Sequence, residues 1–105
     1  MAWVYLFSAA VLEIVWALGL KSTHGFSRLG PSIGVIITMA ASMFLLALAA
    51  RGIPIGTAYA IWTGIGGAGT AIFGMIFLGE PATVARIVCI VLIVSGVVGL
   101  KFFAK

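Results

Sequence analysis

The chain has 105 residues, of which 64% are hydrophobic and 8% are charged, and its formal net charge is +4. Soluble globular domains carry about 25% charged residues, so this composition excludes that class and indicates an integral membrane protein. The cations lie between or at the ends of the apolar segments, where they would meet anionic lipid. No basic cluster interrupts those segments, which argues against a nucleic-acid partner.

Four apolar segments, each near the ~20 residues that a membrane-spanning helix needs, account for almost the whole chain. In lipid, a spanning helix satisfies its own backbone hydrogen bonds, and the segments lack the alternating polarity of barrel strands. We therefore predict an all-α integral membrane protein, a single domain over residues 1–105. Its four transmembrane helices form a bundle and lie near residues 2–20, 31–50, 54–78 and 84–103.

The first segment carries Glu13, the only acidic residue inside any of the apolar segments. A charge at that depth costs at least about 2.5 kcal/mol, so a functional site is the default interpretation. The acid, and the lack of a basic leading region, argue against a signal peptide. Trp16 shares the helical face of Glu13 among small side chains. A carboxylate beside an aromatic ring suits an organic cation, so this face is a candidate pocket wall.

The second segment contains one hydroxyl near its middle, Ser42. Its neighbours at helical spacing are Met39, Met43 and Leu46, which places the hydroxyl toward the bundle or the site. Three partners remain open for it: Glu13, a substrate, or a backbone carbonyl.

The third segment places Tyr59 and Trp62 on one helical face. Two aromatic residues with polar groups, so far from a helix end, are not typical of the interfacial aromatic belt. We predict that they line the site. Three glycines follow, and they indicate either a bend in the helix or close helix packing: Gly64, Gly66 and Gly67.

The fourth segment is apolar apart from Ser95, and its small residues predict a dimer contact made by Ser95, Gly96 and Gly99. Cys89 is the only cysteine, so it forms no intrachain disulfide, and we interpret it as a small packing residue. Glu80 precedes Pro81 in the last turn, where we expect a loop salt bridge or a helix-start role.

The cations of the loops and ends are balanced between the two sides of the membrane. One side carries three of them, Arg51, Lys101 and Lys105, and the other carries Lys21, Arg28 and Arg86. Because the bias of lysine and arginine sets orientation, a balanced chain should insert in both directions. Two opposite copies would pair with the inverted-repeat symmetry of transporters. Chance is the alternative explanation, since small proteins have few charges.

These motifs together resemble the small multidrug resistance transporters, and the resemblance covers essentially the whole chain. It rests on Glu13-x-x-Trp16, on Lys21, on the run from Pro54 to Gly66, and on the Gly79-Glu80-Pro81 turn. Glu13 with Trp16, and the Trp62-Thr63-Gly64 run, are most similar to the guanidinium exporter branch.

The resemblance implies an antiparallel, dual-topology homodimer in the inner membrane of a prokaryote. It implies export of guanidinium and small guanidinyl cations in exchange for protons, with proton and substrate competing for paired Glu13 carboxylates. The residues that it assigns to the substrate and proton site are Glu13, Trp16, Ser42 as a hydrogen-bond partner of the acid, Tyr59 and Trp62. Gly64 and Gly66 match the family's kink in the third helix. Ala10 departs from the branch, which favours glycine there, and this puts the shape of the pocket in question.

Two other functions remain open. One is a quaternary ammonium or multidrug cation antiporter of the same family, which the presence of Trp16 beside the acid disfavours. The other is a non-transporting membrane interaction subunit, in which Glu13 pairs with a partner's base. The sequence holds no nucleophile–base pair, metal cluster or phosphate loop, so we expect no enzyme activity, no cofactor and no metal.

Overall fold

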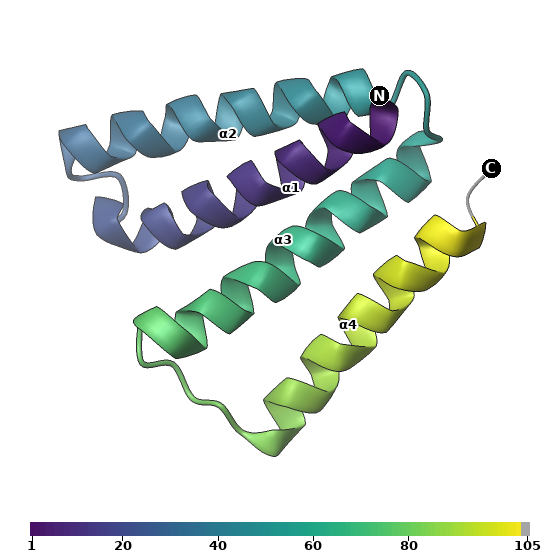
Figure 1. Cartoon of the computed structure of the whole chain (residues 1–105). Coiled ribbons are helices and arrows are strands. Elements are labelled where there is room, and N and C mark those ends of the chain that lie inside the picture. The colour runs from purple at the N-terminus through teal and green to yellow at the C-terminus, as the bar shows by residue number, and fades with distance from the viewer. Residues whose placement is uncertain (104–105) are drawn as a thin grey trace.

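A computed structural model of the protein describes residues 1–103, so Lys105, counted among the cations above, lies outside the described residues. The described chain forms α1 (Ala2–Gly19), a 3-10 turn η1 (Leu20–Thr23), α2 (Leu29–Ala49), α3 (Ile55–Phe77) and α4 (Val84–Phe103) (Figure 1). All four α-helices are long and apolar enough to cross a membrane, which confirms the predicted helical class. The helix α2 begins two residues before Pro31, because proline is tolerated in the first turn of a helix.

The helices lie side by side in the order α2, α1, α3, α4, as Figure 1 shows. The helix α1 packs between α2 and α3, whereas the backbone of α4 approaches α3 alone. The Cα atoms span 42 × 34 × 16 Å, and the backbone of α4 contacts neither α1 nor α2. The prediction of a bundle is therefore wrong for the single chain, which is an open layer of helices.

The core of this layer lies on α1 and the halves of α2 and α3 that face it. Its buried members are Leu6, Ala9, Ala10, Leu46, Ala49, Ile53, Ala58, Ile61 and Trp62. Four of the nine are alanines, and such small side chains let membrane helices approach closely.

In contrast, α4 has one buried residue, Ile90. Cys89 beside it is exposed, so the interpretation of Cys89 as a packing residue is wrong within the chain, because it lies on the part of α4 that α3 does not cover.

A buried hydroxyl joins three of the helices. The Oγ of Ser42 on α2 donates to the carbonyl oxygen of Ala9 on α1 at 2.6 Å, and it accepts a hydrogen bond from the Nε1 of Trp62 on α3 at 3.0 Å. All three residues are buried. A polar group buried in an apolar surrounding is costly unless it is paired, so this network fixes the positions of α1, α2 and α3 relative to one another.

Replacing Ser42 with alanine should lower the free energy of unfolding in detergent by about 1 kcal/mol, because the indole N–H of Trp62 loses its acceptor. Trp62→Phe removes the donor instead. The Ser42→Ala, Trp62→Phe double variant should lose less free energy of unfolding than the two single variants lose in sum, as measured by denaturant unfolding. Strict additivity would show that the hydrogen bond contributes nothing.

Candidate functional site between α1 and α3

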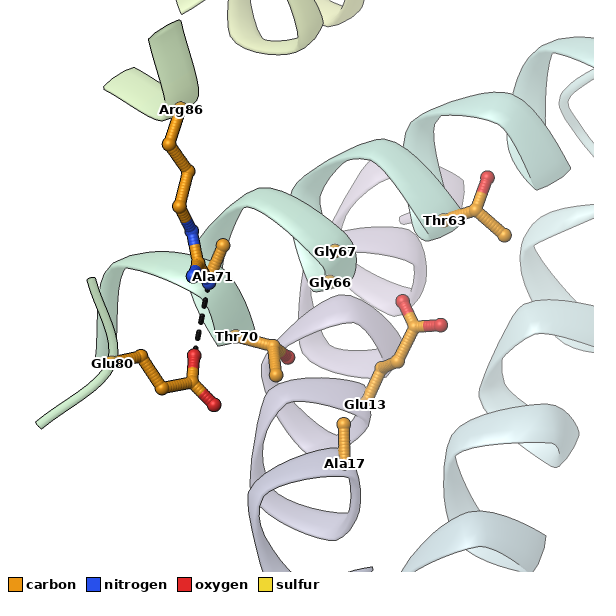
Figure 2. A pocket seen from close by; sticks show the side chains of 9 residues that line it. All are labelled: Glu13, Ala17, Thr63, Gly66, Gly67, Thr70, Ala71, Glu80 and Arg86. Atoms are coloured by element: carbon orange, nitrogen blue, oxygen red, sulfur yellow. Dashed lines mark hydrogen bonds and ion pairs between the residues drawn. The ribbon is translucent and has the colours of Figure 1, made fainter. Parts of the chain in front are cut away.

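Glu13 lies past the middle of α1 and is buried, with 9% of its surface exposed. Its carboxyl group lies directly over Gly66 of α3 (Figure 2). A Cβ atom built on Gly66 would overlap Oε1, Cδ and Cγ of Glu13, so the space for the carboxyl group exists only because residue 66 is a glycine. Three residues further along α3, Gly69 makes similar room for Ile14 of α1. The close approach of α1 and α3 thus depends on two glycines.

The carboxyl group of Glu13 faces a cavity of about 350 Å³. This volume is well above the ~30 Å³ that one liquid water molecule occupies, so the cavity has room for a small ion with its hydration water. Its walls come from α1, α3, the α3–α4 turn and the first turn of α4, and they are Glu13, Ala17, Thr63, Gly66, Gly67, Thr70, Ala71, Glu80 and Arg86 (Figure 2).

Three buried polar atoms have no hydrogen-bond partner within residues 1–103: Oε1 of Glu13, Oγ1 of Thr70 and Nε1 of Trp16. The first two belong to residues that line the cavity. Native proteins pair nearly all buried polar atoms, so two unpaired oxygens in residues of one cavity wall mark a polar group that the described chain by itself does not satisfy. In the same described part of the chain, the one salt bridge joins Arg86 to Glu80, so no basic side chain neutralises Glu13.

The three aromatic residues predicted as walls do not line this cavity in the single chain. Trp16 lines a separate cavity of about 420 Å³ between α1 and α2. Trp62 is buried and bonded to Ser42, while Tyr59 is 54% exposed and packs on Trp62 with ring centroids 5.6 Å apart.

Ser42 and the small residues also have defined positions. Among the partners left open for Ser42, the structure shows a backbone carbonyl, that of Ala9, and no hydrogen bond to Glu13 in the described chain. The helix α3 continues through Gly64, Gly66 and Gly67 without a break, and Gly64 lies against Val97 of α4. Gly64 and Gly66 therefore serve close packing in the structure, whereas a Cβ atom on Gly67 would meet nothing within 4 Å, and the bend stays a prediction.

The predicted dimer contact on α4 is largely uncovered in the chain. Ser95 and Gly96 are exposed, Gly99 is half-buried, and a Cβ atom on either glycine would meet nothing within 4 Å. The hydroxyl of Ser95 donates to Val91 of its own helix at 2.8 Å. The contact itself stays a prediction.

Sequence reasoning missed Thr70 and Arg86 as members of the site. Thr63, Gly66 and Thr70 follow one another at spacings of three and four, so they share one helical face, and this spacing could have indicated Thr70. Nothing in the local sequence places Arg86 beside the cavity. The salt bridge expected for Glu80 is confirmed, since Nη2 of Arg86 lies 3.0 Å from Oε1 of Glu80.

Gly66→Ala should lower the free energy of unfolding by about 1–3 kcal/mol, because the added methyl group displaces the buried Glu13 side chain. In a Glu13→Ala background the same change should cost nothing. Gly67→Ala is the matched control, since a Cβ atom there meets nothing within 4 Å and alanine favours the helix. Unfolding in detergent is measured for the native chain and for four variants: Gly66→Ala, Glu13→Ala, the two combined, and Gly67→Ala. Equal effects at positions 66 and 67 would refute the contact.

The chain was compared with known proteins. The sequence model of the family described as Small Multidrug Resistance protein matches residues 1–93. A protein of Yersinia pseudotuberculosis named guanidinium exporter is 58% identical over 101 residues, which cover 96% of this chain and 97% of the relative. A guanidinium exporter of Salmonella typhimurium is 57% identical over 104 residues, covering 99% of both chains.

A further relative with the same name, from Escherichia coli, is 54% identical over 101 residues, covering 96% of each chain. The matches extend over α1, α2, α3 and the beginning of α4, and so include every wall of the cavity that holds Glu13. With a family model over most of its residues and relatives more than half identical along nearly their whole length, this chain belongs to the small multidrug resistance protein family.

Proposed function

We propose that the protein exports guanidinium across the plasma membrane of a prokaryote in exchange for protons, and that the two ions compete for Glu13. One observation carries the proposal: a buried carboxyl group lines a cavity with room for a small ion and forms no salt bridge within residues 1–103, since Arg86 in the same cavity pairs with Glu80. A charge buried without a partner is expensive, so a cation that enters the cavity is stabilised there. The name shared by the relatives supports guanidinium as that cation.

The oxygen atoms of the cavity favour guanidinium over a quaternary ammonium ion. Guanidinium is planar, and its forked N–H groups match both oxygens of a carboxylate. Its remaining N–H groups call for hydrogen-bond acceptors in the cavity walls, where Thr63 and Thr70 carry hydroxyl groups. A tetra-alkylammonium ion has no N–H group, so it would leave the buried carboxylate without these hydrogen bonds, which is costly.

Exchange follows from the use of one group by two ions. Guanidinium forms its ion pair only with the charged carboxylate, and a proton bound to Glu13 removes that charge. A cation arriving from one side therefore releases the proton, and a proton arriving from the other side releases the cation. If the protein changes its facing direction mainly when Glu13 is occupied, proton entry drives guanidinium exit.

An antiparallel homodimer is the assembly that fits this mechanism. The cavity, Tyr59 and most of α4 are open on the surfaces of the single chain, which therefore does not enclose the site. An inverted copy would cover them and bring a second Glu13 to the same site, where the two carboxylates would titrate as a coupled pair. In this dimer the roles of Trp16, Tyr59 and Trp62 as walls around the cation stay predictions. The three-against-three cation balance supports insertion in both directions.

The first test compares proteoliposomes of the native chain with those of Glu13→Gln and Glu13→Asp. The native chain should show proton flux driven by a guanidinium gradient, Glu13→Gln should lose it to background, and Glu13→Asp should retain a measurable part because it keeps the carboxylate. Tetramethylammonium serves as the second substrate and should drive little flux. Proton-coupled transport by Glu13→Gln would contradict the proposal, and a silent native chain would favour the interaction subunit.

A second test addresses the orientation of the chain. Arg51→Gln and Arg28→Gln each remove one exposed cation, from opposite sides, so each should bias insertion in the opposite direction. Each variant alone should confer less guanidinium tolerance on cells than the native chain, and co-expression of the two should restore it. Full activity of both single variants, with all copies facing one way in a labelling assay, would exclude the antiparallel dimer.

A further inference from the structure

We infer that Glu80 is an outer binding site for guanidinium ions at the end of the Glu13 cavity, and that the guanidinium group of Arg86 occupies it at rest. The inference rests on the proposed function, since it assigns the point at which the same substrate class first meets the protein. Glu80 and Arg86 line the same cavity as Glu13, and Figure 2 shows their contact at one end with Thr70 between them and Glu13.

The contact is already a complex of a carboxylate with the proposed substrate class. Nη2 of Arg86 donates to Oε1 of Glu80 at 3.0 Å, and the arginine head group is itself a substituted guanidinium ion. A guanidinium ion from solution can make the same hydrogen bond and the same ion pair. Both side chains are 34% exposed, and ion pairs so accessible to water contribute little to stability, so the exchange of one guanidinium group for another is not costly.

Glu80 is held in place by its surroundings and does not extend freely into solvent. Its backbone N–H donates to the carbonyl of Gly74 at 3.3 Å. A Cβ atom on Gly74 would overlap the carboxyl group of Glu80, so a glycine on α3 provides the space, as Gly66 does for Glu13. Gly79, with φ of 67°, adopts the left-handed conformation that turns the chain back toward α3. Two acids of this protein therefore each lie over a glycine of α3.

Arg86 is also positioned. Its backbone N–H donates to Oγ1 of Thr83 at 3.2 Å, which fixes the first turn of α4 beside Glu80. The C-terminal end of α3 next to this pair carries the partial negative charge of a helix terminus, which attracts cations. From Phe77 to Gly66 the helix rises roughly 16 Å, and Thr70 of the cavity wall lies between these two ends. A cation released from Glu80 would therefore pass Thr70 before it reaches Glu13.

A purely structural salt bridge that closes the α3–α4 turn is the alternative, and the two roles differ in the sign of their effects. If Glu80 binds substrate and Arg86 competes for it, loss of the acid weakens guanidinium binding and loss of the arginine strengthens it. If the pair is structural, both losses leave the same unpaired turn, and their effects have the same sign. Opposite shifts are therefore the signature of the outer site.

The experiment measures initial rates of guanidinium transport in proteoliposomes over a range of guanidinium concentrations. Glu80→Gln should raise KM at least five-fold, and Arg86→Gln should lower KM at least two-fold. The double variant should resemble Glu80→Gln, because removing the competitor has no effect once the site is gone. KM is the chosen quantity because it does not depend on how many copies insert and assemble correctly.

Arg28→Gln is the matched control. It removes a cation from the same side of the membrane as Arg86, so it disturbs orientation equally, but its exposed side chain lies away from the cavity and KM should stay at the native value. Unchanged KM in both single variants, or shifts in the same direction, would overturn the outer site while leaving the proposed function intact. A native chain that moves no guanidinium would overturn both. If Glu80→Gln does not fold, Arg86→Gln decides alone, since an unchanged or raised KM contradicts competition.

Discussion

The packing of α1 against α3 depends on one constraint, which is that a carboxyl group must fit between them. Glu13 is buried at this contact, and its side chain occupies the place that any side chain at Gly66 would take. Burial removes the water that would stabilise its charge, and no base in the described chain replaces that water. The fold therefore holds an acid that has no salt-bridge partner in the described chain. The proposed exchange of a proton and a cation at Glu13 follows from that arrangement.

The remaining contacts fix α1, α2 and α3 relative to one another but leave α4 largely uncovered. Ser42 ties α1, α2 and α3 together from the side of the layer that holds the core, so the helix that carries Glu13 and the helix that carries Gly66 stay in register. In contrast, the backbone of α4 contacts α3 alone. One side chain of α4 reaches α1, since Nζ of Lys101 lies 4.3 Å from the ring centre of Trp3. A chain in which three helices are joined by hydrogen bonds and the fourth is largely uncovered is suited to pairing with a second copy, as proposed here.

The two ends of the cavity differ in the pairing of their acids. Glu13 lies at its membrane end without a partner, and Glu80 lies at its loop end with a guanidinium group already bound. Both acids lie over glycines of α3, so the same helix surface accommodates both of them. In the proposed mechanism a cation would move from an exposed, weakly held site to a buried one, where the lower dielectric strengthens its ion pair. The two proposed sites thus differ in depth, but each would bind a cation through a carboxylate.

The sequence by itself determined the helical class and predicted Glu13 as the candidate site residue. Apolar length fixes four helices, and a single acid among them marks Glu13, because the cost of a charge in lipid depends on its depth and hardly on its neighbours. The sequence could not place Trp16, Ser42 or Arg86, because helical periodicity gives the face of each residue but not which helix lies opposite. The tertiary structure decided that Trp16 faces α2, that Ser42 bonds Ala9 and Trp62, and that Arg86 closes on Glu80. These contacts join residues on different elements, and only the packing of the helices brings them together.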